Sequence, residues 1–236
     1  MTILAWGRIV GPSGVTGMSA RRFAAQLDWL QDAALPILGL EAAVGRPGAG
    51  VALSLDGGHR EIYTKVLPLL LARGMAATAY VPTAAVTSGQ PLAGGGPPLT
   101  WPMIRELADA GWQVGSHGLR QEALAGLGDD ALRRSLRDSR AALEDALGVR
   151  CRHFAPPAGE LDGRLLDEIL AAGYATVAVG RRGPRGGRGV AGVVRRAHIA
   201  AATPWWLFRA RARGWDGRLG GRKGWILGRW GSRVLD

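Results

Sequence analysis

The sequence of 236 residues contains a single cysteine, Cys151, which excludes an internal disulfide and any metal site built from several thiolates. It has no run of 18 apolar residues, so it predicts no membrane-spanning helix. Its first ten residues lack the basic segment and the long apolar core of a secretory signal. From these absences we expect a cytoplasmic protein.

Acidic residues are scarce in the last quarter of the chain. Residues 181–236 hold 14 Lys and Arg but only 2 Asp and Glu, whereas residues 1–180 hold 16 basic and 17 acidic residues. The net charge of +11 therefore comes from the C-terminal part. Such an asymmetry predicts an anionic partner for a basic segment that follows a nearly neutral domain.

The basic segment is also rich in tryptophan: residues 205–236 hold five of the nine Trp together with eight Lys and Arg. Trp beside Arg is typical of a segment that meets an anionic membrane surface. Stacking on nucleic acid needs the same residues, but no nucleic-acid-binding motif accompanies them, so we expect no nucleic acid partner. The third interpretation is a final helix that packs its Trp onto the domain. We expect such packing for residues 205–213 and a membrane-facing or flexible role for the rest, which would allow a peripheral position on the inner face of the membrane.

Hydrophobic periodicity alternates between strands and helices along residues 1–204, which we take as one domain. Strands are expected at residues 2–6, 51–55, 77–81, 112–115, 153–154, 174–179 and 193–199. Helices are expected at residues 19–31, 62–70, 102–110, 129–147 and 162–172. This order predicts an α/β fold with a mainly parallel sheet, and periodicity leaves open whether the sheet closes into a barrel. Gly-rich loops are expected at residues 90–98 and 180–192.

Residues 51–58, Val-Ala-Leu-Ser-Leu-Asp-Gly-Gly, are the most informative stretch. A buried strand ends in Asp56, which stands on a tight turn with two glycines. The C-terminal ends of parallel strands are where α/β proteins place their chemistry, so Asp56 is a candidate catalytic residue. The alternative is that Asp56 caps the helix that follows the strand.

A second strand, at residues 112–115, delivers His117 to the same edge of the sheet. Gln121 follows four residues later, and on a turn or a nascent helix this spacing places both side chains on one face. That is the usual geometry of two metal ligands, although an amide oxygen binds zinc-like metals weakly. The alternative is a structural histidine that bonds a backbone carbonyl.

These stretches resemble the motifs of the polysaccharide deacetylase family (NodB-homology proteins, carbohydrate esterase family four). Asp56-Gly57-Gly58 is similar to its Asp-Asp-Gly motif, and His117 with Gln121 is similar to its pair of histidines four residues apart. Residues 152–159, Arg-His-Phe-Ala-Pro-Pro-Ala-Gly, resemble the segment that walls its substrate groove. The resemblance covers residues 2–210 and implies a deformed (β/α) barrel.

The resemblance implies a divalent metal, held by an Asp and two His, that polarises an N-acetyl carbonyl while the first Asp acts as base. Here the three ligand positions hold Gly57, His117 and Gln121, so we expect no metal cofactor. A zinc-like metal is expected only if His59 or His153 replaces the lost ligands. Alanines stand in the places of the arginine that orients the catalytic Asp (Ala155) and of a groove tyrosine (Ala158), so we expect Asp56 to lack arginine support.

The resemblance thus implies a divergent protein that acts on or binds an N-acetylated glycan or glycolipid, with hydrolysis of an amide C–N bond as the ancestral reaction. One alternative is a non-catalytic carbohydrate-binding pseudoenzyme, and another is a metal-independent enzyme in which Asp56 and His117 perform acid/base chemistry. The family's general-acid histidine comes from the region of His198, but the local pattern resembles the late strand of the family, so that role is not assigned. The candidate substrate-groove residues are Gly57, Gly58, His59, Gln121, Pro156 and Pro157.

Overall fold

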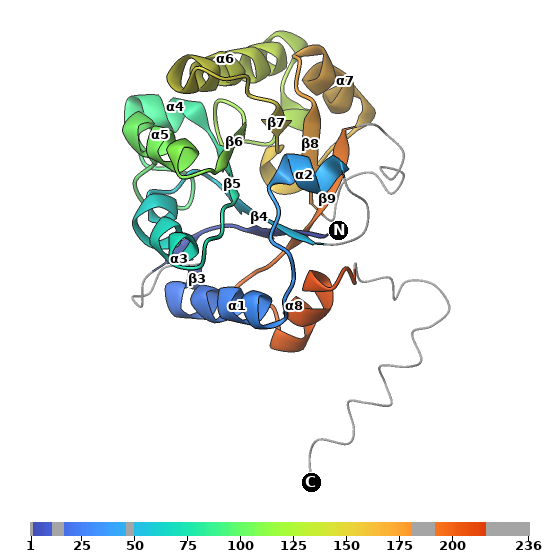
Figure 1. Ribbon diagram of the computed structural model, residues 1–236. Helices are drawn as coiled ribbons and strands as arrows, with labels where there is room; N and C mark the ends of the chain where they lie inside the picture. The colour runs from blue at the N-terminus through green and yellow to red at the C-terminus, as the bar shows by residue number, and fades with distance from the viewer. Residues whose placement is uncertain (1, 11–16, 46–49, 181–191, 216–236) are drawn as a thin grey trace, which may run out of the picture.

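Seven parallel strands close into a barrel (Figure 1). The computed structural model describes residues 2–10, 17–45, 50–180 and 192–215. Around the barrel the strands are β1 (Thr2–Trp6), β4 (Val51–Asp56), β5 (Thr78–Val81), β6 (Gln113–Ser116), β7 (His153–Phe154), β8 (Thr176–Val179) and β9 (Val193–His198). Strand β9 also pairs with β1, which closes the sheet. The α/β fold class is confirmed, and the sheet is a closed barrel.

Helices surround the barrel on its outer side (Figure 1). They are α1 (Ala20–Asp32), α3 (Leu67–Leu71), α4 (Thr83–Ser88), α5 (Trp101–Asp109), α6 (Asp129–Leu147), α7 (Gly163–Ala171) and α8 (Trp205–Ala212). Strands β2 (Ile9–Val10) and β3 (Met18–Ser19) form a separate pair. The helix expected at residues 62–70 begins as a π-helix, Ile62–Val66, before continuing as α3. The expected loop at residues 180–192 lies almost wholly outside the described residues.

Helix ends follow local capping chemistry. Ser19 caps α1 by accepting a hydrogen bond from the Arg22 amide, and Asp162 caps α7 through the Leu165 amide. Helix α6 ends at Gly148, whose φ of 69° is left-handed. These signals are legible in the sequence, which explains why α1, α6 and α7 lie close to their expected positions.

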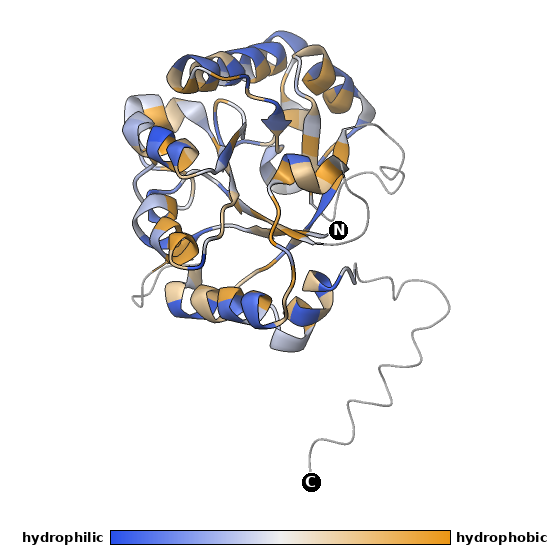
Figure 2. Ribbon diagram, in the orientation of Figure 1, coloured by the Kyte–Doolittle hydropathy of each residue, from blue (hydrophilic) through white to orange (hydrophobic). Residues whose placement is uncertain are grey.

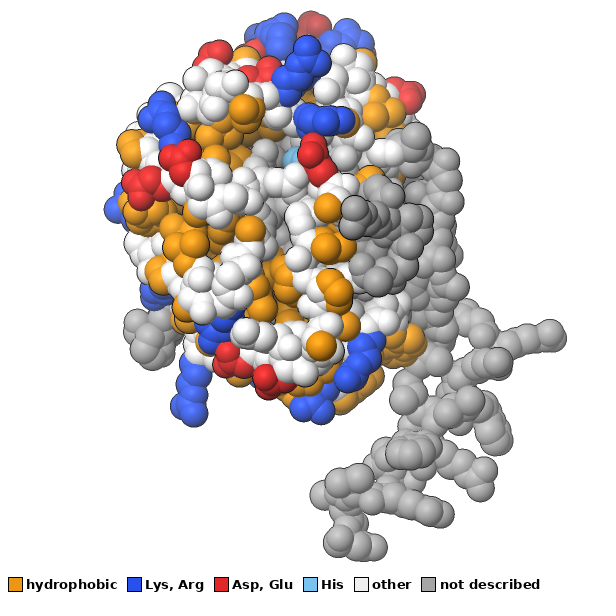
Figure 3. Space-filling view, in the orientation of Figure 1, with side chains coloured by type: hydrophobic (Ala, Val, Ile, Leu, Met, Phe, Trp, Pro, Cys, Tyr) orange, Lys and Arg blue, Asp and Glu red, His pale blue; other side chains and the backbone are white. Residues whose placement is uncertain are grey.

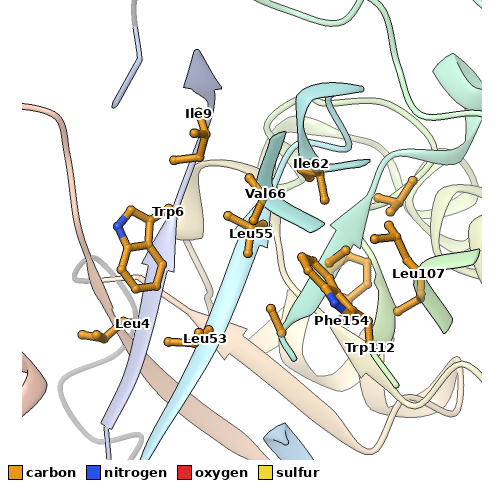
Figure 4. Close-up of a cluster of buried hydrophobic side chains, with 14 of the residues drawn as sticks. Leu4, Trp6, Ile9, Leu53, Leu55, Ile62, Val66, Leu107, Trp112 and Phe154 are labelled. Atoms are coloured by element: carbon orange, nitrogen blue, oxygen red, sulfur yellow. The ribbon is translucent and has the colours of Figure 1, made fainter. Parts of the chain in front are cut away.

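Period-2 alternation divides each strand between the outer core and the barrel interior. On β4, Leu53 and Leu55 belong to the outer core beneath the helices, with Leu4 and Trp6 of the neighbouring β1 (Figure 4). Ala52, which precedes Leu53 and points to the other face, belongs to a second cluster in the interior. That interior cluster is formed largely by small side chains around one large ring: Ile3, Leu40, Ala43, Ala52, Tyr80, Ala155 and Ala178.

Helix α2 (Leu40–Gly45), which the sequence did not predict, covers the end of the barrel where the strands begin. The Leu40 amide donates to the side-chain oxygen of Gln113, the first residue of β6, over 2.6 Å. Leu40 and Ala43 insert into the interior cluster. This end of the barrel is therefore filled by side chains, and the pocket lies at the opposite end, where the strands finish.

Polar residues lie mainly on the outer faces of the helices. Figure 2 shows α6 with a strongly hydrophilic outer surface, and the face drawn in Figure 3 carries its Lys, Arg, Asp and Glu mostly around the periphery. Within the described ranges, no helix combines the length and the apolar character needed to cross a bilayer. The buried surface of the domain is concentrated in the layer between strands and helices.

Candidate active site

A cavity of about 410 Å³ opens where the barrel strands end. Four strands deliver polar residues to it: Asp56 is the last residue of β4, His198 the last of β9, His117 directly follows β6, and Arg8 lies two residues beyond β1. The cavity is lined by Ala5, Gly7, Arg8, Asp56, His59, His117, Gln121, Pro156, Gly159, Gly180, Arg196 and His198. The structure thus brings five of the predicted site residues together: Asp56, His59, His117, Gln121 and Pro156.

Asp56 is held by an ion pair with Arg196 of β9. One Asp56 carboxylate oxygen lies 2.5 Å from Arg196 Nη1, and the arginine side chain is only 3% exposed. The guanidinium also lies 5.0 Å from the centroid of the Tyr80 ring and 3.4 Å from Ser54 Oγ. Asp56 therefore does not cap a helix, and the π-helix that follows the strand begins without a side-chain cap.

The expectation that Asp56 lacks arginine support was wrong. Ala155, in the place of the family's arginine, is buried in the barrel interior, but Arg196 reaches the carboxylate from another strand. Small interior residues such as Ala155 and Ala178 leave room for the Arg196 and Tyr80 side chains. Period-2 alternation in β9 carries the missed signal, because Arg196 and His198 are two residues apart and share one face.

The ion pair fixes the charge of Asp56. Burial alone would raise the pKa of this carboxyl, but the neighbouring Arg196 charge and hydrogen bond, together with His117, bring the pKa below its ordinary value. Asp56 is therefore a carboxylate at neutral pH. A lowered pKa also makes it a weaker proton acceptor, because a general base works best with a pKa near the operating pH.

His117 presents a neutral imidazole to the cavity. Its Nδ1 lies 2.7 Å from the carbonyl oxygen of Ala155, which can only accept, so Nδ1 carries the proton and Nε2 has the lone pair. Burial lowers the pKa of His117, outweighing the opposite effect of Asp56. The alternative expected for His117 was a structural histidine bonded to a backbone carbonyl, and this hydrogen bond is present. The His117 side chain also lines the pocket.

Gly57 lies against two other predicted groove residues. A Cβ built on Gly57 would lie 3.2 Å from both Gln121 Nε2 and His59 Cδ2, and the backbone here has a φ of 97°. Two buried atoms around it, Gln121 Oε1 and His59 Nδ1, have no hydrogen-bond partner among the described residues. Burial and the nearby Arg8 lower the pKa of His59. These atoms are available to a bound molecule that carries hydroxyl or amide groups.

The remaining predicted groove residues have structural surroundings. Gly58 has a φ of 65°, and its carbonyl accepts the Leu99 amide. Pro157 is buried at the start of a short 3-10 helix, Pro157–Gly159. Neither residue is among those that line the cavity, so their contribution is to shape the two turns that carry Asp56 and Pro156.

Arg8 also lines the pocket. Its guanidinium lies 2.9 Å from a Glu61 carboxylate oxygen and donates to the Gly94 carbonyl over 3.2 Å. Burial would raise the pKa of Glu61, but the hydrogen bond from Arg8 lowers it overall. This ion pair ties the turn after β1 to residues 61 and 94, far away in the sequence.

Solved structures with similar folds include proteins described as deacetylases. IcaB from Ammonifex degensii has a TM-score of 0.77 and 24% identity, covering 90% of this chain and 96% of that one. The deacetylase PplD of Streptococcus pyogenes has a TM-score of 0.78 and 18% identity, covering 90% and 97%. The de-N-acetylase of Aggregatibacter actinomycetemcomitans has a TM-score of 0.73 and 17% identity, covering 89% and 98%. These likenesses define a deacetylase-type barrel.

Family membership rests on the sequence itself. The family model described as polysaccharide deacetylase matches residues 43–177, more than half of the chain. A search of curated proteins found no significant match. The chain belongs to the polysaccharide deacetylase family. The region matched includes Asp56, His117 and Gln121.

The side chains present do not fit the divalent metal that the family implies. Of the three positions assigned to the metal, Gly57 has no side chain, His117 offers Nε2, and Gln121 offers an amide oxygen. Among residues 2–10, 17–45, 50–180 and 192–215, no three His, Cys, Asp or Glu are grouped as a metal site would require.

The two histidines considered as replacement ligands lie at opposite ends of the barrel. His59 lies beside Gly57 in the pocket. His153 starts β7, and its Nε2 lies 3.4 Å from Gln113 and 3.7 Å from Glu41 of α2, at the end where the strands begin. His153 therefore cannot complete a set of ligands with His117, and His59 alone adds one nitrogen.

Proposed function

We propose that this protein binds an N-acetylated glycan or glycolipid in the pocket formed by Asp56, His117 and Gln121, without metal-dependent amide hydrolysis. The observation that carries the proposal is the set of possible metal ligands. The three ligand positions offer one imidazole nitrogen from His117, one amide oxygen from Gln121 and no side chain at Gly57. A catalytic zinc-type site usually has three protein ligands, two more than the single good donor here.

The state of Asp56 supports the same proposal. Its carboxylate is bonded to Arg196 and has a lowered pKa, so it is poorly suited to take a proton from water. A carboxylate in this state is well suited to accept hydrogen bonds from sugar hydroxyls. The pocket chemistry therefore favours recognition over proton transfer.

The size and polarity of the pocket suit a small part of a glycan. Its volume of about 410 Å³ lies in the range of small-molecule sites. Acceptor atoms such as the Asp56 carboxylate and Gln121 Oε1 can receive hydroxyl and amide hydrogens, and Pro156 gives an apolar wall. N-acetyl sugars offer these donors together with an apolar methyl group.

Titration with chitotetraose, followed by calorimetry or amide NMR, tests binding. We expect saturable binding that Gln121→Ala weakens about two- to tenfold, because one hydrogen bond contributes about 0.5–1.5 kcal/mol. The matched control is Gln90→Ala, which makes the same change at an exposed loop position and should leave affinity unchanged. Equal affinities for the two variants, or no binding to any N-acetylated oligosaccharide offered, would contradict the proposal.

Acetate release and metal content, measured on the same protein, test the absence of metal-dependent hydrolysis. We expect no acetate release from chitotetraose with or without added zinc, cobalt or nickel, and less than stoichiometric metal by elemental analysis. Stoichiometric metal together with turnover that chelation abolishes would overturn the proposal. Metal-free turnover that His117→Gln abolishes would instead favour the acid/base enzyme.

A further inference from the structure

The outer side of α1 and α8 carries a concentration of tryptophan and arginine that the pocket does not use. We define the Trp/Arg face as Trp29 of α1, Trp205, Trp206, Arg209 and Arg213 at α8, and Trp215 just beyond it. Phe208 anchors it, since this buried ring packs on Trp29 and Trp205 at centroid distances of 5.5 and 5.3 Å. The face therefore rests on a fixed part of the barrel.

The arginines of the face are held over indole rings. Arg213 lies 4.9 Å from the Trp29 centroid, and Arg209 lies 5.7 Å from Trp29 and 5.5 Å from Trp205. Both arginines are exposed. Stacking leaves the guanidinium edges and their N–H groups free to bind phosphate, so the stacked pairs are pre-organised donors.

The indole rings are only partly covered. Trp206 is 56% exposed, and its ring lies 6.1 Å from that of Trp215. Among the described residues, the other large exposed hydrophobic side chains are the aliphatic Val44, Leu71, Val149 and Leu170. The face therefore presents two accessible indole rings, which are amphipathic, beside two guanidinium groups, which are positively charged.

Basic residues outnumber acidic ones around this face, to which α1 contributes two acidic residues, Asp28 and Asp32. The sequence has no Asp or Glu between residues 199 and 215. On α1, Asp28 is paired with Arg73 over 2.6 Å. Residues 216–236 add five Lys and Arg and two Trp against two Asp. The chain that continues from the face therefore carries the same combination of residues.

We infer that the Trp/Arg face docks on the surface of an anionic phospholipid bilayer. Indole rings favour the headgroup region, and each basic residue near such a surface contributes about a fivefold gain in binding, corresponding to about 1 kcal/mol. Nucleic acid would also meet arginine and tryptophan, but no nucleic-acid-binding motif accompanies these residues in the sequence. This inference does not depend on what the pocket binds.

Co-sedimentation of the full chain with vesicles tests the inference. We expect binding to phosphatidylcholine vesicles that contain 30% phosphatidylglycerol and little binding to pure phosphatidylcholine. Arg209→Gln with Arg213→Gln should lower the partition coefficient about thirtyfold, from two basic contacts. Trp206→Ser should lower it as well, without changing the net charge.

The matched control is Arg134→Gln with Arg137→Gln, two exposed arginines of α6 that give the same change in net charge. We expect this control to bind as the unaltered protein does, and thermal melts should show that all variants are folded. Equal losses in the two double variants would overturn the inference, because net charge alone would then explain binding. Failure to bind anionic vesicles, or binding only to nucleic acid offered at the same salt concentration, would overturn it too.

Removal of residues 216–236 separates the face from the segment that follows it. We expect the shortened chain to bind anionic vesicles more weakly but still to depend on Arg209 and Arg213. Loss of all binding in this chain would overturn the inference, since it would assign the membrane surface to residues 216–236 alone.

Discussion

Replacement of Arg196 by methionine is the most informative perturbation of this protein. The substitution removes the guanidinium and keeps much of the volume that packs over Tyr80. It leaves the Asp56 carboxylate, whose side chain is 19% exposed, without its partner at 2.5 Å. Breaking a buried ion pair by removing one partner costs about 3–5 kcal/mol, and we expect the lower end of that range because Asp56 retains some contact with solvent.

Urea unfolding followed by circular dichroism measures this change. With a slope of about 3 kcal/mol per molar, a loss of about 3 kcal/mol lowers the midpoint by about 1 M. The double variant Asp56→Asn/Arg196→Met serves as the control, because it removes both charges. We expect it to be more stable than Arg196→Met alone, since the cost lies in the unpaired carboxylate rather than in the loss of the pair.

The pH dependence distinguishes this explanation from a simple packing defect. In the unaltered protein the pKa of Asp56 is lowered from 3.8, so its contribution to stability is present above the unfolded pKa and is lost as pH falls through the folded value. Burial is the largest influence on the pKa of Asp56 and raises it, so without Arg196 we expect that pKa to rise and protonation to relieve the cost as pH falls. The difference in unfolding free energy should therefore be largest near pH 7 and narrow below about pH 4. A difference that stays constant with pH would refute the role of the charge.

Two further predictions concern the barrel interior and the pocket. Gly115→Ala should lower the unfolding free energy by about 1–3 kcal/mol, because a Cβ there would lie 2.6 Å from Tyr80 and 2.9 Å from the His153 carbonyl. The control is Gly126→Ala, because nothing lies within 4 Å of a Cβ built at Gly126. Equal thermal midpoints for the two variants would contradict the packing argument. Burial lowers the pKa of His59, His117 and His198 from 6.5. The contribution of these histidines to stability is therefore present above pH 6.5 and is lost as pH falls through the folded pKa values. Imidazole NMR should find each pKa below 6.5, and a pKa above 6.5 at His117 would contradict the buried neutral ring.

Local signals in the sequence were sufficient for most of the fold. Ser19 and Asp162 mark the starts of two helices, and the alternating residues of β4 mark a strand that ends at Asp56. Helices α2 and α4, six residues each, were missed because a short helix carries too few positions for a 3.6-residue period to emerge. The π-helix at Ile62–Val66 has no distinct local pattern.

The site was only partly predictable because its defining contact is non-local. Asp56 and His117 were recognisable from the turns that follow their strands. Arg196 lies 140 residues from Asp56, and although the alternation in β9 places Arg196 on the same face as His198, no local pattern identifies Asp56 as its partner. Only the closed barrel, in which β9 returns to pair with β1, brings the guanidinium to the carboxylate. A motif comparison therefore detected the loss at Ala155 and could not detect the arginine that replaces it.

The place of Arg196 on the closing strand has a consequence for how the protein matures. During synthesis, Asp56 emerges 140 residues before the arginine that neutralises it. Until β9 is available, a partly assembled barrel has open edges at β1 and β8 and an uncompensated acid near its centre. Closure of the barrel and neutralisation of Asp56 therefore depend on the same strand, β9. A chain truncated before residue 196 lacks both, so such incomplete products should remain open to proteolysis, and only a chain that includes β9 should acquire the pocket.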